Sequence, residues 1–74
     1  MARATRLRRG VQVRVKKDAT GEFTNWVGRV LYRYDDDDYA VAFPFRHHAL
    51  IPLGSGKYGA FFGRDELELE RVEP

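Results

Sequence analysis

The chain has 74 residues, of which 43% are hydrophobic and 14% aromatic, and its formal net charge is +2. Such a composition is typical of one small folded domain and excludes disorder by composition, although a core of this size stabilises the fold only modestly. The sequence contains no cysteine, which excludes disulfides and thiolate chemistry, and no apolar run approaches the ~20 residues of a membrane span. We therefore expect a soluble cytoplasmic protein that does not enter a membrane, for which self-association is one source of further stability.

The chain begins with a basic segment. Residues 1–9 are rich in arginine and poor in apolar side chains, which predicts a flexible arm before a folded domain over residues 10–74, with Leu7 able to pack back onto that domain. Up to Lys17 the chain has seven cations and no acid, whereas the remainder has six cations and eleven acids. The basic side chains that could contact phosphates or an acidic protein, or only keep the domain in solution, are Arg8, Arg9, Arg14, Lys16 and Arg29.

The first half of the domain contains two predicted strands and a loop. Residues 10–16 alternate between apolar and polar side chains, which predicts a strand whose valines face the core. Residues 17–25 lack a sustained period and are expected to form a loop, in which Phe23 plugs the core or makes an exposed contact. Residues 26–32, Trp-Val-Gly-Arg-Val-Leu-Tyr, predict the central strand, and Gly28 indicates a bend or a place where another backbone comes close.

An acidic run and a long connection follow. Residues 35–38 are four aspartates, whose mutual repulsion favours a solvated turn. The alternating residues 39–44 then predict a strand that completes an antiparallel hairpin with the central strand. The connection over residues 45–57 is long for so small a domain, so we expect it to be functional, to be mobile or to contain a short extra strand.

The last segments complete the predicted fold. Residues 58–62 predict a strand, residues 63–66 a single helical turn, and residues 67–72 a final alternating strand. In that strand Leu67 and Leu69 are expected to face inward. The pattern predicts an all-β fold, namely a small five-stranded antiparallel barrel with one short 3-10 turn before the last strand.

The order of these segments resembles the SH3-like barrels of the electron-transport accessory group, which includes the variable chain of ferredoxin–thioredoxin reductase and the small stromal subunit of photosystem I. The residues that carry the resemblance are Val27-Gly28-Arg29-Val30, Tyr39-Ala40-Val41-Ala42-Phe43 and Phe61-Phe62-Gly63-Arg64-Asp65-Glu66-Leu67-Glu68. The resemblance implies a non-catalytic accessory subunit without a cofactor, which binds a redox partner or stabilises a larger subunit. Arg14, Lys16 and Arg29 would then contact an acidic partner, whereas the 45–57 insertion has no counterpart in that group.

A second resemblance is to the type II dihydrofolate reductases. It rests on residues 13–17, on Trp26 with Gly28, and on residues 39–41 and 69–72. The Gln-Ile-Tyr segment that lines the active pore of those enzymes falls here near Ala60-Phe61-Phe62, which has neither the amide nor the phenol. We therefore expect no reductase activity even if the scaffold is similar.

The remaining candidate sites have simpler interpretations. His47 and His48 are neighbours whose side chains point apart on an extended segment, and no second ligand group lies at a suitable spacing, so we expect solvent-exposed histidines and no bound metal. The aspartates 35–38 lack the spacing of a calcium loop, and Ser55 has no evident base beside it. The sequence therefore predicts neither an active site nor a cofactor.

The aromatic and apolar side chains near the two loops are the predicted contact residues. We expect a non-catalytic interaction module that binds a protein partner or a second copy of itself through loops 17–25 and 45–57. The residues expected to make that contact are Phe23, Trp26, Phe45, Leu50, Ile51 and Tyr58. The alternative is a nucleic-acid-binding barrel that uses the basic arm and the first strand, with Trp26 or Phe45 stacking on bases.

Overall fold

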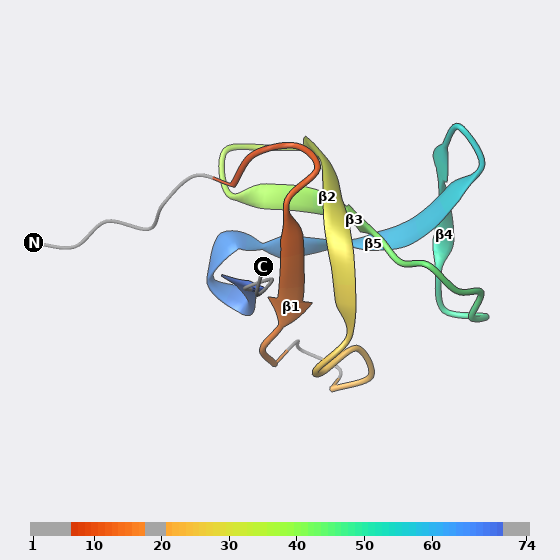
Figure 1. The fold of residues 1–74 in the computed structure, drawn as a ribbon, viewed down its shortest axis with the longest axis horizontal. Helices are drawn as coiled ribbons and strands as arrows, with labels where there is room; N and C mark the ends of the chain where they lie inside the picture. Colours follow the sequence, from red (N-terminus) through yellow and green to blue (C-terminus); the bar gives the residue numbers. More distant parts are fainter. Residues whose placement is uncertain (1–6, 18–20, 71–74) are drawn as a thin grey trace, which may run out of the picture.

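The structure, a computed structural model, describes residues 7–17 and 21–70 (Figure 1). Its elements are β1 (Gln12–Val15), β2 (Val27–Arg33), β3 (Asp38–Ala42), β4 (Ile51–Gly54), β5 (Lys57–Gly63), the 3-10 turn η1 (Arg64–Glu66) and β6 (Leu67–Leu69). The strands form one antiparallel sheet in the order β4-β5-β3-β2-β1-β6. The predicted all-β class, the hairpin of β2 and β3, and the short helical turn before the last strand are confirmed.

The strand count differs from the prediction. The sixth strand, β4, is a short strand inside the 45–57 connection, where it pairs with β5. Among the described residues the sheet is not closed, because β4 and β6 lie at its two edges. The predicted five strands are therefore six, and the hydrogen bonding describes an open sheet rather than a closed barrel.

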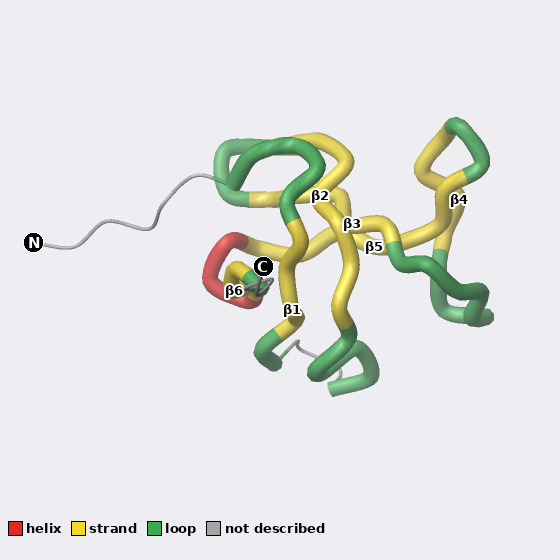
Figure 2. Tube along the Cα trace, in the orientation of Figure 1, coloured by secondary structure: helices red, strands yellow, loops and turns green. Residues whose placement is uncertain are grey.

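The sheet is strongly coiled. In Figure 1, β1 and β2 run across β3 and β5, and the hairpin of β4 with the first residues of β5 extends away from this crossing. Figure 2 shows the short helical turn between β5 and β6, which carries the chain round to the free edge of β1. There Arg14 lies opposite Glu68, and Val15 lies opposite Leu67. No helix of the described residues is long and apolar enough to cross a membrane.

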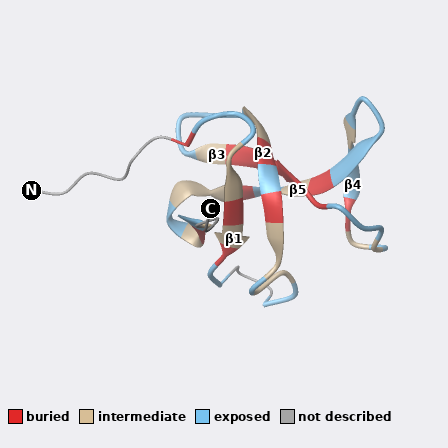
Figure 3. Cartoon of the chain, viewed as in Figure 1, coloured by how far each residue is buried: buried red, intermediate tan, exposed pale blue. Residues whose placement is uncertain are grey.

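The core lies where β1 and β2 cross β3 and β5, as the buried stretches in Figure 3 show. As the alternation predicts, Val13 and Val15 are fully buried, and Val11 packs against the core with part of its surface exposed. The buried residues of the core cluster are Leu7, Val13, Val15, Val30, Tyr39, Val41, Phe43, Leu50, Phe62 and Leu67.

Gly28 marks a close approach between β2 and the chain beside it. A Cβ atom at this position would collide with the carbonyl oxygen of Ala42 and press on the side chains of Phe43 and Val41. Gly59 on β5 has the same relation to the carbonyl oxygen of Val41. The two glycines therefore let both neighbours of β3 come close to its backbone, which confirms the prediction made for Gly28.

Leu7 packs back onto the sheet. Its side chain is buried, and its backbone N–H donates to the hydroxyl of Tyr39 at 3.3 Å. Gly10 N–H donates to the carbonyl of Val30 at 2.7 Å, which continues the attachment. The end of the predicted arm is thus part of the folded domain, while residues 1–6 of that arm lie outside the described residues.

Two leucines are placed differently from the prediction. The alternation predicts that Leu69 faces inward, but 53% of it is exposed, because it lies at the end of the outermost strand. Leu50 is predicted to be an exposed contact residue, but only 8% of it is exposed and it belongs to the core cluster. A turn causes this burial, since Leu50 N–H donates to the carbonyl of His47 at 3.0 Å and the chain bends inward before β4.

Candidate interaction surface

The two loops that the sequence singled out meet at one end of the molecule. The ring of Trp26 lies 4.9 Å from that of Phe45 at an interplanar angle of 79°, and 5.4 Å from that of Phe43 at 83°. Phe23 contacts Trp26 in the same edge-to-face manner, at 4.9 Å and 87°. Edge-to-face contacts place the positive edge of one ring against the negative face of another, so they hold the cluster in a defined geometry.

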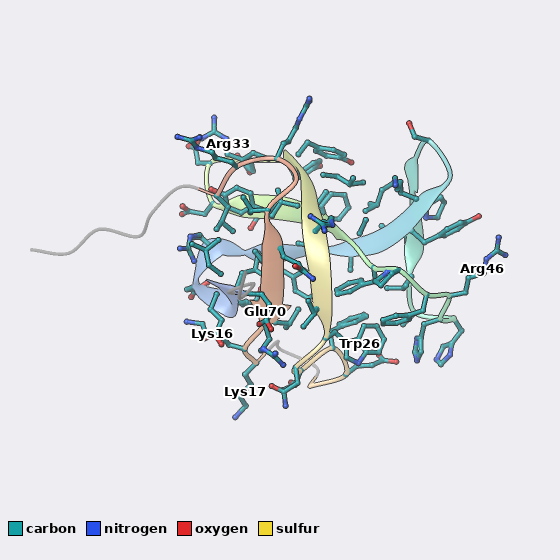
Figure 4. All side chains as sticks on the ribbon, viewed as in Figure 1. Lys16, Lys17, Trp26, Arg33, Arg46 and Glu70 are labelled. Atoms are coloured by element: carbon teal, nitrogen blue, oxygen red, sulfur yellow. The ribbon has the colours of Figure 1, made fainter. Side chains whose placement is uncertain are left out.

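The aromatic cluster has an inner and an outer side. Phe23 packs against the core and lies 5.5 Å from the ring of Phe62, which confirms that it plugs the core. Trp26 is half-buried, whereas Phe45 is 42% exposed. Figure 4 shows Trp26 at the end of the molecule where β2 begins and Arg33 at the opposite end. The outer side of the cluster therefore presents ring surface to solvent at this end.

Trp26 is positioned by a tight turn fixed to β1. Trp26 N–H donates to the carbonyl of Phe23 at 3.0 Å, and Asn25, with φ of 72°, provides the left-handed backbone conformation that asparagine tolerates. Two backbone hydrogen bonds attach the turn to Val15. The N–H of Asn25 donates to the carbonyl of Val15 at 2.7 Å, and the N–H of Val15 donates to the carbonyl of Trp26 at 2.9 Å. Pairing with β1 thus fixes the backbone position of Trp26.

A hollow of about 390 Å³ lies beside the cluster. Its walls are Arg46, His47, His48, Leu50 and Tyr58. The guanidinium of Arg46 lies over the ring of Tyr58, 5.4 Å from the centroid, in a cation–π contact. Tyr58 is 36% exposed, so the hollow combines an accessible aromatic wall with a pre-positioned cation. A volume of this size falls within the ~300 to 1,000 Å³ typical of ligand sites.

The two histidines do not point apart as predicted. Their rings stack 4.3 Å apart at an angle of 27°, because the chain turns at this point instead of continuing extended. His47 also contacts Trp26, with ring centroids 4.9 Å apart. Glu22 from the other loop is the second ligand group that the sequence did not reveal, and its carboxylate and the two imidazoles bring ligand atoms within 4.8 Å of one another.

The predicted basic residues do not form one surface. Arg14 donates to both carboxylate oxygens of Glu70, from Nε at 2.9 Å and from Nη2 at 2.8 Å. The hydrogen bonds to Glu70, followed by its negative charge, raise the pKa of Arg14 above its ordinary value. Lys16 is exposed, and its backbone N–H donates to the carbonyl of Glu66 at 2.8 Å. The charge at this part of β1 is therefore partly neutralised.

A second groove gathers the other cations. It encloses about 830 Å³, and its polar wall includes Arg9, Gln12, Arg29 and Lys57. Arg29 is held by a hydrogen bond from Nη1 to the carbonyl of Gly10 at 2.9 Å. Among the described residues that line this groove, none is acidic. Arg8 is exposed and is not part of the lining. Lys57 was missed by the sequence reasoning, because only the β3–β5 pairing brings it to this side.

Ile51 is exposed, as predicted, but it lies on the edge strand β4. Of the six predicted contact residues, the structure therefore brings Phe23, Trp26 and Phe45 into one cluster, adds Tyr58 beside it, and places Leu50 in the core. The cluster also gains Phe43 and His47, which the sequence did not identify as contact residues.

A comparison of the chain with protein-family models, with curated proteins and with solved structures found no match in any of the three.

Proposed function

We propose that this protein is a non-catalytic interaction module that binds an extended segment of a partner protein on its aromatic surface, defined as Trp26, Phe45, Arg46 and Tyr58. One observation carries the proposal. The Trp26–Phe45 contact joins the two loops into a single surface, while 42% of Phe45 and 36% of Tyr58 stay accessible beside a hollow. Aromatic side chains and arginine are the residues enriched in the centres of protein interfaces.

The chemistry of the surface favours a particular kind of segment. Extended peptides dock in grooves lined by aromatic rings, which contact apolar side chains while hydroxyl and indole N–H groups bind the peptide backbone. Arg46 is already oriented by Tyr58, so less side-chain entropy is lost when it pairs with a carboxylate. The partner segment should therefore combine apolar residues with at least one acidic residue.

The strand order supports an SH3-like arrangement for the scaffold. The last strand follows a 3-10 turn and pairs with the first, and β4 is an addition within the 45–57 connection. This arrangement, taken with the resemblance to the accessory group, favours a role as an accessory subunit in the cytoplasm. A second copy of the chain is the alternative occupant of the aromatic surface. Sedimentation velocity over a range of protein concentrations distinguishes self-association from binding of a different partner.

Selection from a random peptide library tests the proposal and does not require an identified partner. The baits are the natural protein and the variant Phe45→Ser with Tyr58→Ser, whose folding is checked by the dispersion of its NMR spectrum. We expect apolar and acidic peptides to be enriched on the natural protein and not on the variant. Failure to enrich any peptide, or equal enrichment on both baits, would contradict the proposal.

A second candidate function is favoured by the basic groove. Arg9, Arg29 and Lys57 line it without an acidic neighbour among the described lining residues, which suits a phosphodiester backbone. Binding of this kind weakens steeply with salt, by a log–log slope of about 0.9 for each phosphate contacted on duplex DNA. Fluorescence anisotropy with a labelled duplex at low salt tests it, and no change in anisotropy would exclude it.

A further inference from the structure

Three side chains of the kinds that bind metal ions meet beside Trp26. Glu22 lies in the turn that precedes it, while His47 and His48 lie in the connection after β3. Ligand atoms of the three all lie within 4.8 Å of one another, and His48 Nε2 is 3.8 Å from Glu22 Oε2. We propose that Glu22, His47 and His48 bind one divalent transition-metal ion, and that Zn²⁺ is the ion this ligand set fits best.

The ligand types support this assignment. Two imidazole nitrogens and one carboxylate oxygen form a set that Zn²⁺ accepts, with bonds of about 2.0 to 2.2 Å. Ligand atoms of a tetrahedral ion at such distances lie roughly 3.3 Å apart, so the separations seen here must close by side-chain rotation. The side chain of His48 is 85% exposed, which leaves it room to rotate toward the other two ligands. A fourth position remains for water or for a group of a bound partner.

His47 is the positioned member of the site. Its ring contacts Trp26 and stacks on His48, and its Nδ1 accepts the N–H of Ala49 at 3.1 Å. A neutral imidazole has one donor and one acceptor nitrogen, so coordination through Nε2 requires the ring proton to move to Nδ1. The hydrogen bond from Ala49 is then lost in exchange for the metal bond. The Ala49 amide should therefore report metal binding directly in an NMR titration.

The inference goes beyond the proposed function, since it needs no partner protein. Bound metal would join the turn before Trp26 to the connection after β3, the same two segments that carry the aromatic surface. The acidic turn at residues 35–38 is another place where a cation could gather, and it offers only carboxylates as ligands. Substituting aspartates of this turn therefore provides the matched control, because it removes carboxylates that could bind the ion nonspecifically and leaves Glu22, His47 and His48 in place.

The chain contains an intrinsic fluorescent reporter of metal binding at this site. Trp26 is the only tryptophan of the chain, and its ring centroid is 4.9 Å from that of His47. We would titrate the full chain, purified without a histidine tag, with Co²⁺ and follow the tryptophan fluorescence, which a paramagnetic ion at this distance quenches. Zn²⁺ added afterwards should displace Co²⁺ and restore the emission. Calorimetry with Zn²⁺ then gives the affinity and the stoichiometry of one ion per chain.

The variants His48→Ala and Glu22→Gln leave the indole contact of His47 in place, so they remove ligands without removing the reporter. We expect each to weaken Co²⁺ and Zn²⁺ binding at least about tenfold, and Asp35→Asn with Asp36→Asn to leave binding unchanged. NMR spectra confirm that each variant is folded. Absence of quenching below millimolar Co²⁺, equal quenching in His48→Ala, or loss of binding in the aspartate variant would each overturn the proposal.

Discussion

Trp26 and Phe45 lie 4.9 Å apart in the two segments that flank the last pair of the β2–β3 ladder. Arg29 lies opposite Ala42 in that ladder, and Trp26 and Phe45 each lie three positions outside this pair along the chain. Residues directly opposite each other on antiparallel strands are close neighbours on one face of the sheet. The pairing of Arg29 with Ala42 therefore brings together the two segments that carry Trp26 and Phe45, while the turn attached to Val15 fixes the position of Trp26.

Gly28 should tolerate no side chain. In Gly28→Ala the new methyl group would meet the carbonyl oxygen of Ala42, a backbone atom that moves only if the β2–β3 pairing is disturbed. We expect a loss of at least about 2 kcal/mol in the free energy of unfolding, measured by urea denaturation. Gly63→Ala is the matched control, because its nearest neighbour is a side-chain oxygen of Asp65 at 3.0 Å, which can rotate away. Equal losses in both variants would contradict the close approach at Gly28.

The attachment of Leu7 depends on the hydroxyl of Tyr39. Tyr39→Phe removes the acceptor of the Leu7 N–H while keeping the ring in its buried place. We expect the variant to lose about 1 kcal/mol of stability. Hydrogen exchange should also become faster at Leu7, while the amide of Gly10, whose acceptor is the carbonyl of Val30, keeps its protection. Unchanged exchange at Leu7 would show that the hydroxyl does not hold this segment.

Leu50 and Ile51 are neighbours with opposite expected behaviour. Leu50→Ala removes a core side chain and should cost about 2 kcal/mol or more. Ile51→Ala changes a side chain that is 44% exposed on an edge strand and should cost less than about 1 kcal/mol. Thermal unfolding of both variants measures the difference. A larger loss in Ile51→Ala than in Leu50→Ala would mean that the turn after His47 is not as described.

The two arginines that the sequence offered as equal contacts should differ in nucleic-acid binding. Arg29→Gln removes a cation from the basic groove and should reduce the salt slope of duplex binding by about 1. Arg14→Gln should leave the slope nearly unchanged, because Arg14 already pairs with Glu70. Anisotropy titrations at several salt concentrations compare them. Equal effects of the two substitutions would show that the groove is not the binding site.

Much of the fold can be predicted from the sequence, because the strands and turns depend on local patterns of residues. The alternation around Val13 and Val15 fixes the buried face of β1, and Gly28 within an aromatic and β-branched run marks close backbone contact. β4 was less predictable: the length of the 45–57 connection suggested a functional segment, a mobile segment or a short extra strand. Its Ile-Pro-Leu-Gly sequence has no alternation that would favour a strand, and Pro52 argues against a central strand. Only an edge strand accommodates such a segment.

The candidate sites were less predictable because they depend on contacts between distant segments. The meeting of Glu22 with His47 requires both the turn before Trp26 and the bend before Leu50, and neither has a signature that fixes its direction. The neutralisation of Arg14 depends in the same way on β6 returning to β1, which places Glu70 within reach. The composition of a loop thus identifies candidate side chains but not their partners.

Whether the aromatic surface binds a partner segment is measured most directly as the affinity of a library-selected peptide for three proteins. Isothermal titration would compare the natural protein, the variant Phe45→Ser, and the control Tyr34→Ser, which alters an exposed tyrosine outside the aromatic surface. We expect a loss of at least about tenfold in Phe45→Ser, equivalent to about 1.4 kcal/mol, and no loss in Tyr34→Ser. Equal affinity for the natural protein and Phe45→Ser would contradict the proposal.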